Sequence, residues 1–242
     1  MYSTAQIGYT FWQKGGNFVA KRTKLRERSL PDYTRGEEIM NMVTHIVGGG
    51  LGVIVLLLCV SRALLNRNPL GVLGSVIYGI TMITLYTMSS VYHGMKPCTG
   101  KKVMQVLDHC TIYFLIAGTY TVIALSALLP VNPLLGWGIL LFQWALTALA
   151  VTLTAIDLHK YAVFSIICYI FMGWCIIFFL PSAVVALTLP GFYWMLAGGI
   201  AYTVGAVLYG IGIKKRWMHS VFHIFVVLGS LLQFLSIFLY CL

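Results

Sequence analysis

Seven long apolar runs, separated by short polar breaks, make up most of this chain. They cover approximately residues 44–64, 71–93, 107–129, 135–155, 161–182, 191–213 and 218–240. Each run has about 20 residues, which is the length an α-helix needs to cross a hydrocarbon core of about 30 Å. Inside lipid the backbone has no water to bond, so a spanning run must be helical. The pattern predicts an all-α membrane protein with seven transmembrane helices within residues 37–242.

The composition supports a lipid environment. Only 9% of the 242 residues are charged and 60% are hydrophobic, whereas a soluble domain carries about 25% charged residues. There is too little polar surface for water on all sides. The net charge of +10 is therefore interpreted as basic loops beside anionic lipid, and we expect no nucleic-acid partner.

The lysines and arginines are distributed very unevenly between the two sides of the predicted bundle. Alternate loops and the N-terminal segment hold fourteen of the sixteen, and the remaining loops hold only Arg62 and Arg67. Because cytoplasmic loops are enriched in Lys and Arg, the N-terminus is predicted to lie in the cytoplasm and the C-terminus outside. Residues 1–36 are expected to form a flexible, basic cytoplasmic tail.

The few ionisable and polar groups near the spans gather at the predicted cytoplasmic end. The first run opens with Glu38, Asn41, Thr44 and His45, the second ends with Ser89 and His93, the third opens with Asp108 and His109, and the seventh opens with His219 and His223. Ionisable residues at membrane depth are costly, so their convergence is a hypothesis of function. The outer half has mainly neutral polar residues, which argues against a channel or transporter.

The histidine spacing suggests a metal site. His219 and His223 are four residues apart and project from one helix face. Zinc takes three or four protein ligands, and a catalytic zinc leaves one position open. His93 could supply the third nitrogen, and Asp108 could orient a water. Alternatively, the histidines are polar anchors at the membrane interface.

The remaining polar residues receive simpler interpretations. We interpret His109 as interfacial, because it points about 100° away from Asp108 around the helix. Asp157, His159 and Lys160 are interpreted as solvated loop residues, and Glu37 as solvated. Glu38 and Asn41 could lock the first helix against the bundle, with His45 as a further supporting residue.

Four motifs carry a family resemblance over about residues 37–242. They are EEIMNMVTH with Glu38, Asn41, Thr44 and His45, SSVYH with Ser89 and His93, LDHCTIYFLIAGTYT with Asp108, and HSVFH with His219 and His223. In this order they resemble the motifs of the hemolysin III family, part of the progestin and adiponectin receptor (PAQR) superfamily.

The resemblance implies properties that the spacing does not show. It implies seven helices with the N-terminus inside, and a zinc ion bound by His93, His219 and His223 with Asp108 linked through water. The superfamily is similar to alkaline ceramidases, which are membrane amide hydrolases. Some family members are credited with cytolytic activity, and bacterial members are linked to membrane homeostasis. The style of the motifs indicates a bacterial protein, so a multi-pass protein of the bacterial inner (plasma) membrane is expected.

Three functions follow as hypotheses. The leading one is a zinc-dependent hydrolase of a lipid amide or ester that enters from the membrane, in which Asp108 orients the water or takes its proton and Ser89 donates a hydrogen bond. The second is a pore-forming cytolysin, which should present a polar stripe along a whole helix. The third is a membrane sensor or receptor with a structural zinc, which typically has four protein ligands.

Overall fold

A computed structural model describes residues 23–242, and within that range the chain forms a bundle of long helices without a β-strand. Residues 1–22 of the predicted tail lie outside the described residues. Six helical stretches of the described chain are long and apolar enough to cross a membrane: α2 (Arg35–Leu65), α3 (Pro69–Gly94), Thr99–Val131, α6 (Pro133–Ile156), Ala162–Gly212 and α9 (Met218–Tyr240). The prediction of an all-helical protein with several membrane spans is confirmed.

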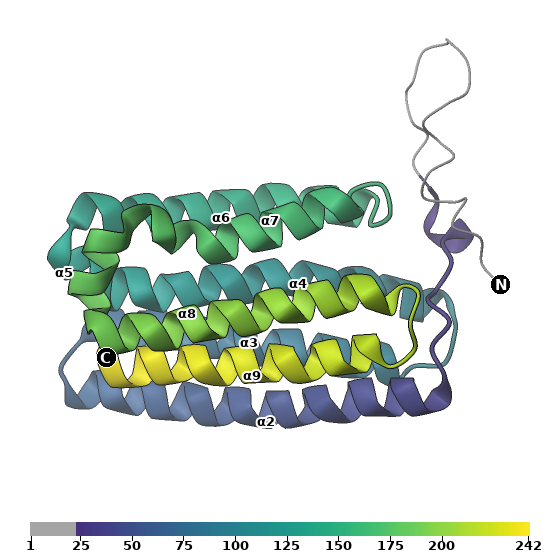
Figure 1. Ribbon diagram of the computed structural model, residues 1–242, viewed down its shortest axis with the longest axis horizontal. Coiled ribbons are helices and arrows are strands. Elements are labelled where there is room, and N and C mark those ends of the chain that lie inside the picture. Colours follow the sequence, from purple (N-terminus) through teal and green to yellow (C-terminus); the bar gives the residue numbers. More distant parts are fainter. Residues whose placement is uncertain (1–22) are drawn as a thin grey trace, which may run out of the picture.

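The count of continuous stretches differs from the seven runs predicted, because no loop separates the fifth run from the sixth. The 51-residue stretch Ala162–Gly212 contains both. It consists of α7 (Ala162–Trp174), the 3-10 turn η3 (Cys175–Phe179) and α8 (Leu180–Gly212). Thr188 has φ 61° inside α8, two residues before Pro190, which interrupts the helix. Figure 1 shows the chain turning back between α7 and the later part of α8.

Local sequence signals set the other helix ends. The stretch Thr99–Val131 contains α4 (Thr99–Ile123), the π-helical turn η2 (Ala124–Leu128) and the short α5 (Leu129–Val131). Asn68 and Asn132 cap α3 and α6, each followed by a proline in the first helical turn. Asparagine accepts a bond from a free helix amide, and proline has no amide hydrogen to leave unpaired there.

The first long helix begins well before the apolar run predicted at residue 44. Thr34 Oγ1 accepts a hydrogen bond from the Glu37 amide at 3.2 Å, and Glu37 Oε2 accepts from the Thr34 amide at 2.8 Å. This capping box starts α2 at Arg35. Two further helical turns result, and they carry Glu38 and Asn41 to the end of the bundle.

Small residues let the central helices approach closely. Figure 1 shows α2 at one edge, α6 and α7 at the other, and α3, α4, α8 and α9 between them. A Cβ on Gly74 would lie 2.7 Å from the Val122 Cα, and one on Gly48 would lie 2.5 Å from the Tyr86 ring. Close backbone contact of this kind is typical of membrane helices. It brings the ends of α2, α3 and α9 together, where the candidate site lies.

Candidate metal centre

Three buried histidines meet where the last turn of α3 reaches the first turns of α9. His93 comes from α3, and His219 and His223 come from α9; their exposed fractions are 3%, 8% and 1%. One ring nitrogen from each lies within 4.8 Å of the other two. The structure therefore brings together the three ligands that the sequence suggested. Together they could bind a metal ion.

Two of these nitrogen atoms are within hydrogen-bond distance of each other, and the same spacing is compatible with one shared metal ion. The Nε2 atoms of His219 and His223 are 3.0 Å apart, close to the separation of about 3.3 Å for two nitrogens on one tetrahedral zinc. His93 Nε2 and His223 Nδ1 are buried with no hydrogen-bond partner in the described chain. Buried polar atoms are rarely left unpaired, and a cation held by these rings would satisfy His93 Nε2.

The first helix fixes the orientation of His93. Glu38 Oε2 lies 2.6 Å from His93 Nδ1, and Asn41 Nδ2 lies 3.4 Å from the same nitrogen. The shorter contact decides the tautomer, because a carboxylate only accepts hydrogen bonds and Nδ1 must then carry the proton. The lone pair is left on Nε2, which is the form that binds metals. The predicted locking role of Glu38 is thus directed at His93.

Two more rings stack on histidines of the cluster. His45 stacks on His223 with centroids 3.8 Å apart, and its edge meets Tyr86 at 5.0 Å. Tyr33 stacks on His219 at 4.9 Å. Burial, and then the charges of Tyr209 and Asp108, raise the pKa of Tyr33 well above its usual value, so its phenol stays neutral. Tyr33 was missed because it precedes the apolar runs; its place just before the capping box is the only signal.

Asp108 and Ser89 lie near the cluster without joining the group of three nitrogens. Ser89 is one helical turn before His93 on α3, and its buried Oγ has no partner in the described chain. Asp108, on α4, is half-buried. Its charge acts on Tyr33, the ring that stacks on His219. Both side chains therefore belong to the surroundings of the histidines.

His109 makes its hydrogen bonds outside the group of three histidines, although its partner Tyr209 also contacts the His219 ring at 5.5 Å. Its Nδ1 lies 2.8 Å from the Gln105 carbonyl oxygen, and its Nε2 lies 3.4 Å from the Tyr209 hydroxyl. The first contact makes Nδ1 a donor, since a carbonyl only accepts. This arrangement keeps His109 out of the metal-binding group, as its direction on the helix predicted.

Residues 23–34, here called the N-terminal strap, cross the end of the bundle beside this site. Figure 1 shows them running from the side of α6 and α7 to the start of α2. The Thr23 amide donates to Asp157 Oδ2 at 2.9 Å, and the Arg28 guanidinium donates to the Ile156 carbonyl at 2.9 Å. Asp157 is only 1% exposed, so the interpretation of this residue as solvated was wrong. The strap covers it.

Just beyond the other end of the strap, Glu37 in the first turn of α2 joins this helix to α9. Glu37 is buried, and its Oε1 accepts a hydrogen bond from the Trp217 amide at 2.6 Å. Trp217 is the N-cap of α9 and has φ 67°. Arg216 reaches both Glu37 Oε2 at 3.3 Å and Asp32 Oδ2 at 3.4 Å. The interpretation of Glu37 as solvated was therefore also wrong, because one carboxylate serves the N-termini of two helices.

The fold and the site together define a class: a multi-pass helical membrane protein with a buried three-histidine cluster at one end of the bundle. The family model described as haemolysin-III related matches residues 33–234. The chain belongs to this haemolysin III family. No solved structure matches it.

Curated relatives agree with this assignment. The chain is 34% identical to Hemolysin-3 of Bacillus cereus, with 85% of this chain and 92% of the relative covered. It is 31% identical to a Hemolysin-3 homolog of Bacillus subtilis (strain 168), with 86% and 96% covered. The human monocyte to macrophage differentiation factor is 26% identical, with 68% of each chain covered. The predicted relationship to the wider PAQR group is confirmed.

Proposed function

We propose that this protein is a zinc-dependent hydrolase of a lipid amide or ester, acting in the homeostasis of the plasma membrane that holds it. The observation that carries the proposal is the group of three buried imidazoles whose nitrogens lie within 4.8 Å of one another. Burial beside apolar helices excludes bulk water and strengthens electrostatic interactions at the site. An interfacial anchor would instead keep its ring nitrogens in contact with water.

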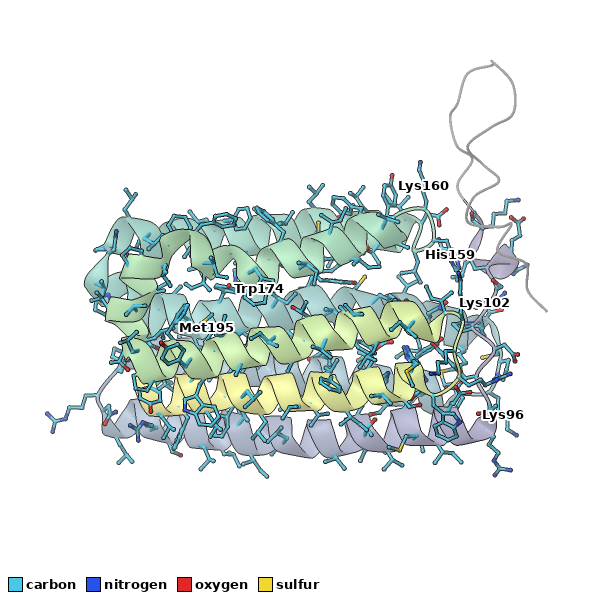
Figure 2. All side chains as sticks on the ribbon, viewed as in Figure 1. Lys96, Lys102, His159, Lys160, Trp174 and Met195 are labelled. Carbon is cyan, nitrogen blue, oxygen red and sulfur yellow. The ribbon has the colours of Figure 1, made fainter. Side chains whose placement is uncertain are left out.

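The proposal includes seven membrane crossings with the N-terminus in the cytoplasm. α7 and the later part of α8 count as separate crossings, because the chain turns back between them (Figure 1). Figure 2 shows Lys96, Lys102 and Lys160 at one end of the bundle. Fourteen of the sixteen basic residues belong to segments assigned to that side. The asymmetry supports a cytoplasmic location for this end and hence for the histidine cluster.

The chain's own residues would divide the chemistry between them. A zinc ion held by His93, His219 and His223 would act as a Lewis acid toward a substrate carbonyl and would activate water. Asp108 would orient the attacking water and accept its proton. The unpartnered Ser89 hydroxyl would donate a hydrogen bond to the carbonyl oxygen as negative charge develops on it. Tyr33 and His45 would limit access of water.

A lipid is the substrate class that suits this environment. The outer faces of the long helices carry exposed apolar side chains, including Leu57, Leu141 and Val207. These faces contact hydrocarbon in a membrane, so a lipid reaches the bundle at high local concentration. The acyl carbonyl of a lipid amide or ester lies near the polar boundary, at the depth of helix ends. The histidine cluster lies at such helix ends.

Elemental analysis of the purified protein tests the metal. About one zinc per chain is expected in mild detergent, and none when His93, His219 and His223 are all changed to alanine. The matched control is His159→Ala, which removes a histidine from the loop at the same end and should leave the zinc content unchanged. Turnover of a fluorogenic ceramide-type amide should follow zinc content. A parent protein without zinc would refute the proposal.

The cytolysin alternative draws on the printed name of the Bacillus cereus relative. It requires a helix with a polar stripe from end to end, and the described helices instead expose mainly large apolar side chains. Dye release from lipid vesicles would separate the two functions. A pore should release dye whether or not the histidines are intact, whereas a hydrolase should not release it in either case.

A purely structural zinc is the remaining alternative. A closed structural site normally has four protein ligands. Among the described residues the group within ligand distance contains three, all histidines. Zinc that binds without any turnover of lipid amides or esters would favour this alternative.

A further inference from the structure

A buried lysine that the motifs do not include lies beside the histidine cluster. Lys101 is in the first turn of α4, and only 3% of it is exposed. An ammonium group without partners is very unfavourable in such a place. Its partners therefore indicate what it does. They are Glu38 Oε1, the Met95 carbonyl oxygen at 2.9 Å, and the face of the Tyr92 ring at 5.2 Å.

We propose that Lys101 is a positioning residue of the metal centre, which holds His93 through Glu38 and through the end of α3. The inference rests on the proposed function, since it requires that the three histidines bind a metal. Lys101 comes from α4. Glu38 comes from α2, His93 from α3, and the other two histidines from α9.

The first connection runs through side chains. Glu38 divides its carboxylate between two partners, with Oε1 accepting from Lys101 and Oε2 accepting from His93 Nδ1 at 2.6 Å. The ammonium neutralises the carboxylate and fixes its plane. Without Lys101, the half-buried Glu38 would swing toward water. His93 would then lose the acceptor that keeps its proton on Nδ1 and its lone pair on Nε2.

The second connection runs through the main chain. Met95 is the C-cap of α3 and follows His93 by two residues. The last carbonyls of a helix have no intrahelical partner and carry its negative dipole end, so a cation there is favourable. The Lys101 ammonium donates to the Met95 carbonyl. It therefore holds the last turn of α3, which carries His93, as well as the carboxylate that orients the ring.

The neighbouring lysine gives a natural control. Lys102 follows directly on α4, but successive helical residues point about 100° apart. Its ammonium donates to the Arg26 carbonyl of the N-terminal strap at 2.7 Å. The two lysines thus have the same chemistry, the same helical turn and different partners. Changing each to methionine removes one charge and keeps most of the apolar stem.

The experiment measures zinc affinity of the full chain in mild detergent by competition with a chromogenic chelator. Lys101→Met should weaken zinc binding by about 10- to 100-fold, the usual effect of losing a residue that supports a ligand. Lys102→Met should stay within about twofold of the parent. The visible spectrum of bound Co²⁺, which reports ligand geometry, should change only in Lys101→Met.

A double variant separates positioning from folding. Glu38→Gln with Lys101→Met leaves no buried unpaired charge, so it tests the idea even where Lys101→Met alone does not fold. If Lys101 acts in part through Glu38, Lys101→Met should weaken zinc binding less in the Glu38→Gln background than in the parent, and the loss that remains belongs to the Met95 connection. Additive losses, or equal losses in Lys101→Met and Lys102→Met, would overturn the inference.

Failure of the proposed function and failure of the role of Lys101 give different experimental results. A parent protein that binds no zinc removes the proposed function, and the inference with it. A parent that binds zinc, together with a Lys101→Met variant of unchanged affinity and Co²⁺ spectrum, removes only the role of Lys101.

Discussion

The two ends of the bundle use different side chains to bond the backbone groups that the helix termini leave unpaired. At the end away from the histidines, neutral side chains cap two helices: Asn68 Oδ1 accepts from the Gly71 amide at 2.7 Å, and Asn132 Oδ1 accepts from the Leu135 amide at 3.1 Å. Asn66 Nδ2 donates to the Leu242 carbonyl at 2.7 Å, and the Arg62 guanidinium, which is not among the buried charges, donates to the same oxygen at 3.3 Å. At the histidine end, buried charges do this work, with Glu37 bonding the Trp217 amide.

The difference shows which end of the bundle carries the desolvation penalty of buried charges. Neutral asparagine N-caps are sufficient to begin a helix. A buried charge brings a desolvation penalty that its partners must offset. Glu37, Lys101, Arg28 and Asp157 are all at most 3% exposed, and all lie at the histidine end. A bundle that needed only to stand in a membrane would not require them, so their concentration supports a functional role for this end.

The largest expected effect at the histidine end concerns Asp108. Asp108→Asn should lower turnover of a fluorogenic ceramide-type amide by about 100-fold or more, because the amide cannot take a proton from water. Zinc content should stay near one per chain, since Asp108 is outside the group of three nitrogens. Glu27→Gln, which removes an exposed carboxylate from the strap, is the control. Unchanged turnover in Asp108→Asn would show that this carboxylate has no part in the chemistry.

Much of this site could be predicted because the sequence pattern places residues by helix end and helix face. His93, His219 and His223 are found together because the spans that carry them begin or end on the same side. The i, i+4 spacing puts the α9 pair on one face. Asn41 and His45 follow from the same rule, and both are buried.

The missed residues are those whose burial depends on tertiary contacts. In the sequence, Lys101 looks like one more basic loop residue. It has Glu38 as a partner only because α2, α3 and α4 pack together in the fold. Tyr33 lies outside every apolar run, and Asp157 is buried only because the strap crosses it. The fifth and sixth runs are separated by a kink at Thr188, just before Pro190, and the sequence could not show that this break is a kink inside one continuous stretch and not a loop.

An effect of intermediate size is expected on the pH dependence of stability, through the contact between Asp157 and the N-terminal strap. Burial alone would raise the pKa of Asp157, but hydrogen bonds from Thr23 and Lys160 and the charge of Arg28 outweigh it and hold that pKa below its usual value. A carboxylate with a lowered pKa stabilises the fold above its unfolded pKa of about 3.9, and this contribution is lost as the pH falls through the folded value. The parent should therefore melt higher than Asp157→Asn at pH 7, and the difference should close below about pH 4.

Trypsin provides a local measurement of the same contact. At pH 8, Asp157→Asn should be cut faster than the parent at Lys24, Arg26 and Arg28, because the strap loses the acceptor for the Thr23 amide. Glu27→Gln changes the charge of the strap without touching Asp157 and should be cut at the parental rate. Equal rates in all three proteins, with equal melting temperatures at every pH, would mean that Asp157 does not hold the strap.

The smallest effect is expected at the opposite end, and it tests whether the two ends are independent. Asn66→Ala removes one part-buried hydrogen bond to the Leu242 carbonyl, which is worth about 0.5–1.5 kcal/mol. For a chain of this size the melting temperature should fall by about 2–4 °C for each kcal/mol. Zinc affinity should not change, because the bond lies a full helix length from His93. A loss of zinc affinity in this variant would mean that the packing of α2 against α9 carries strain from one end to the other, and the histidine end could then no longer be treated as a separate functional unit.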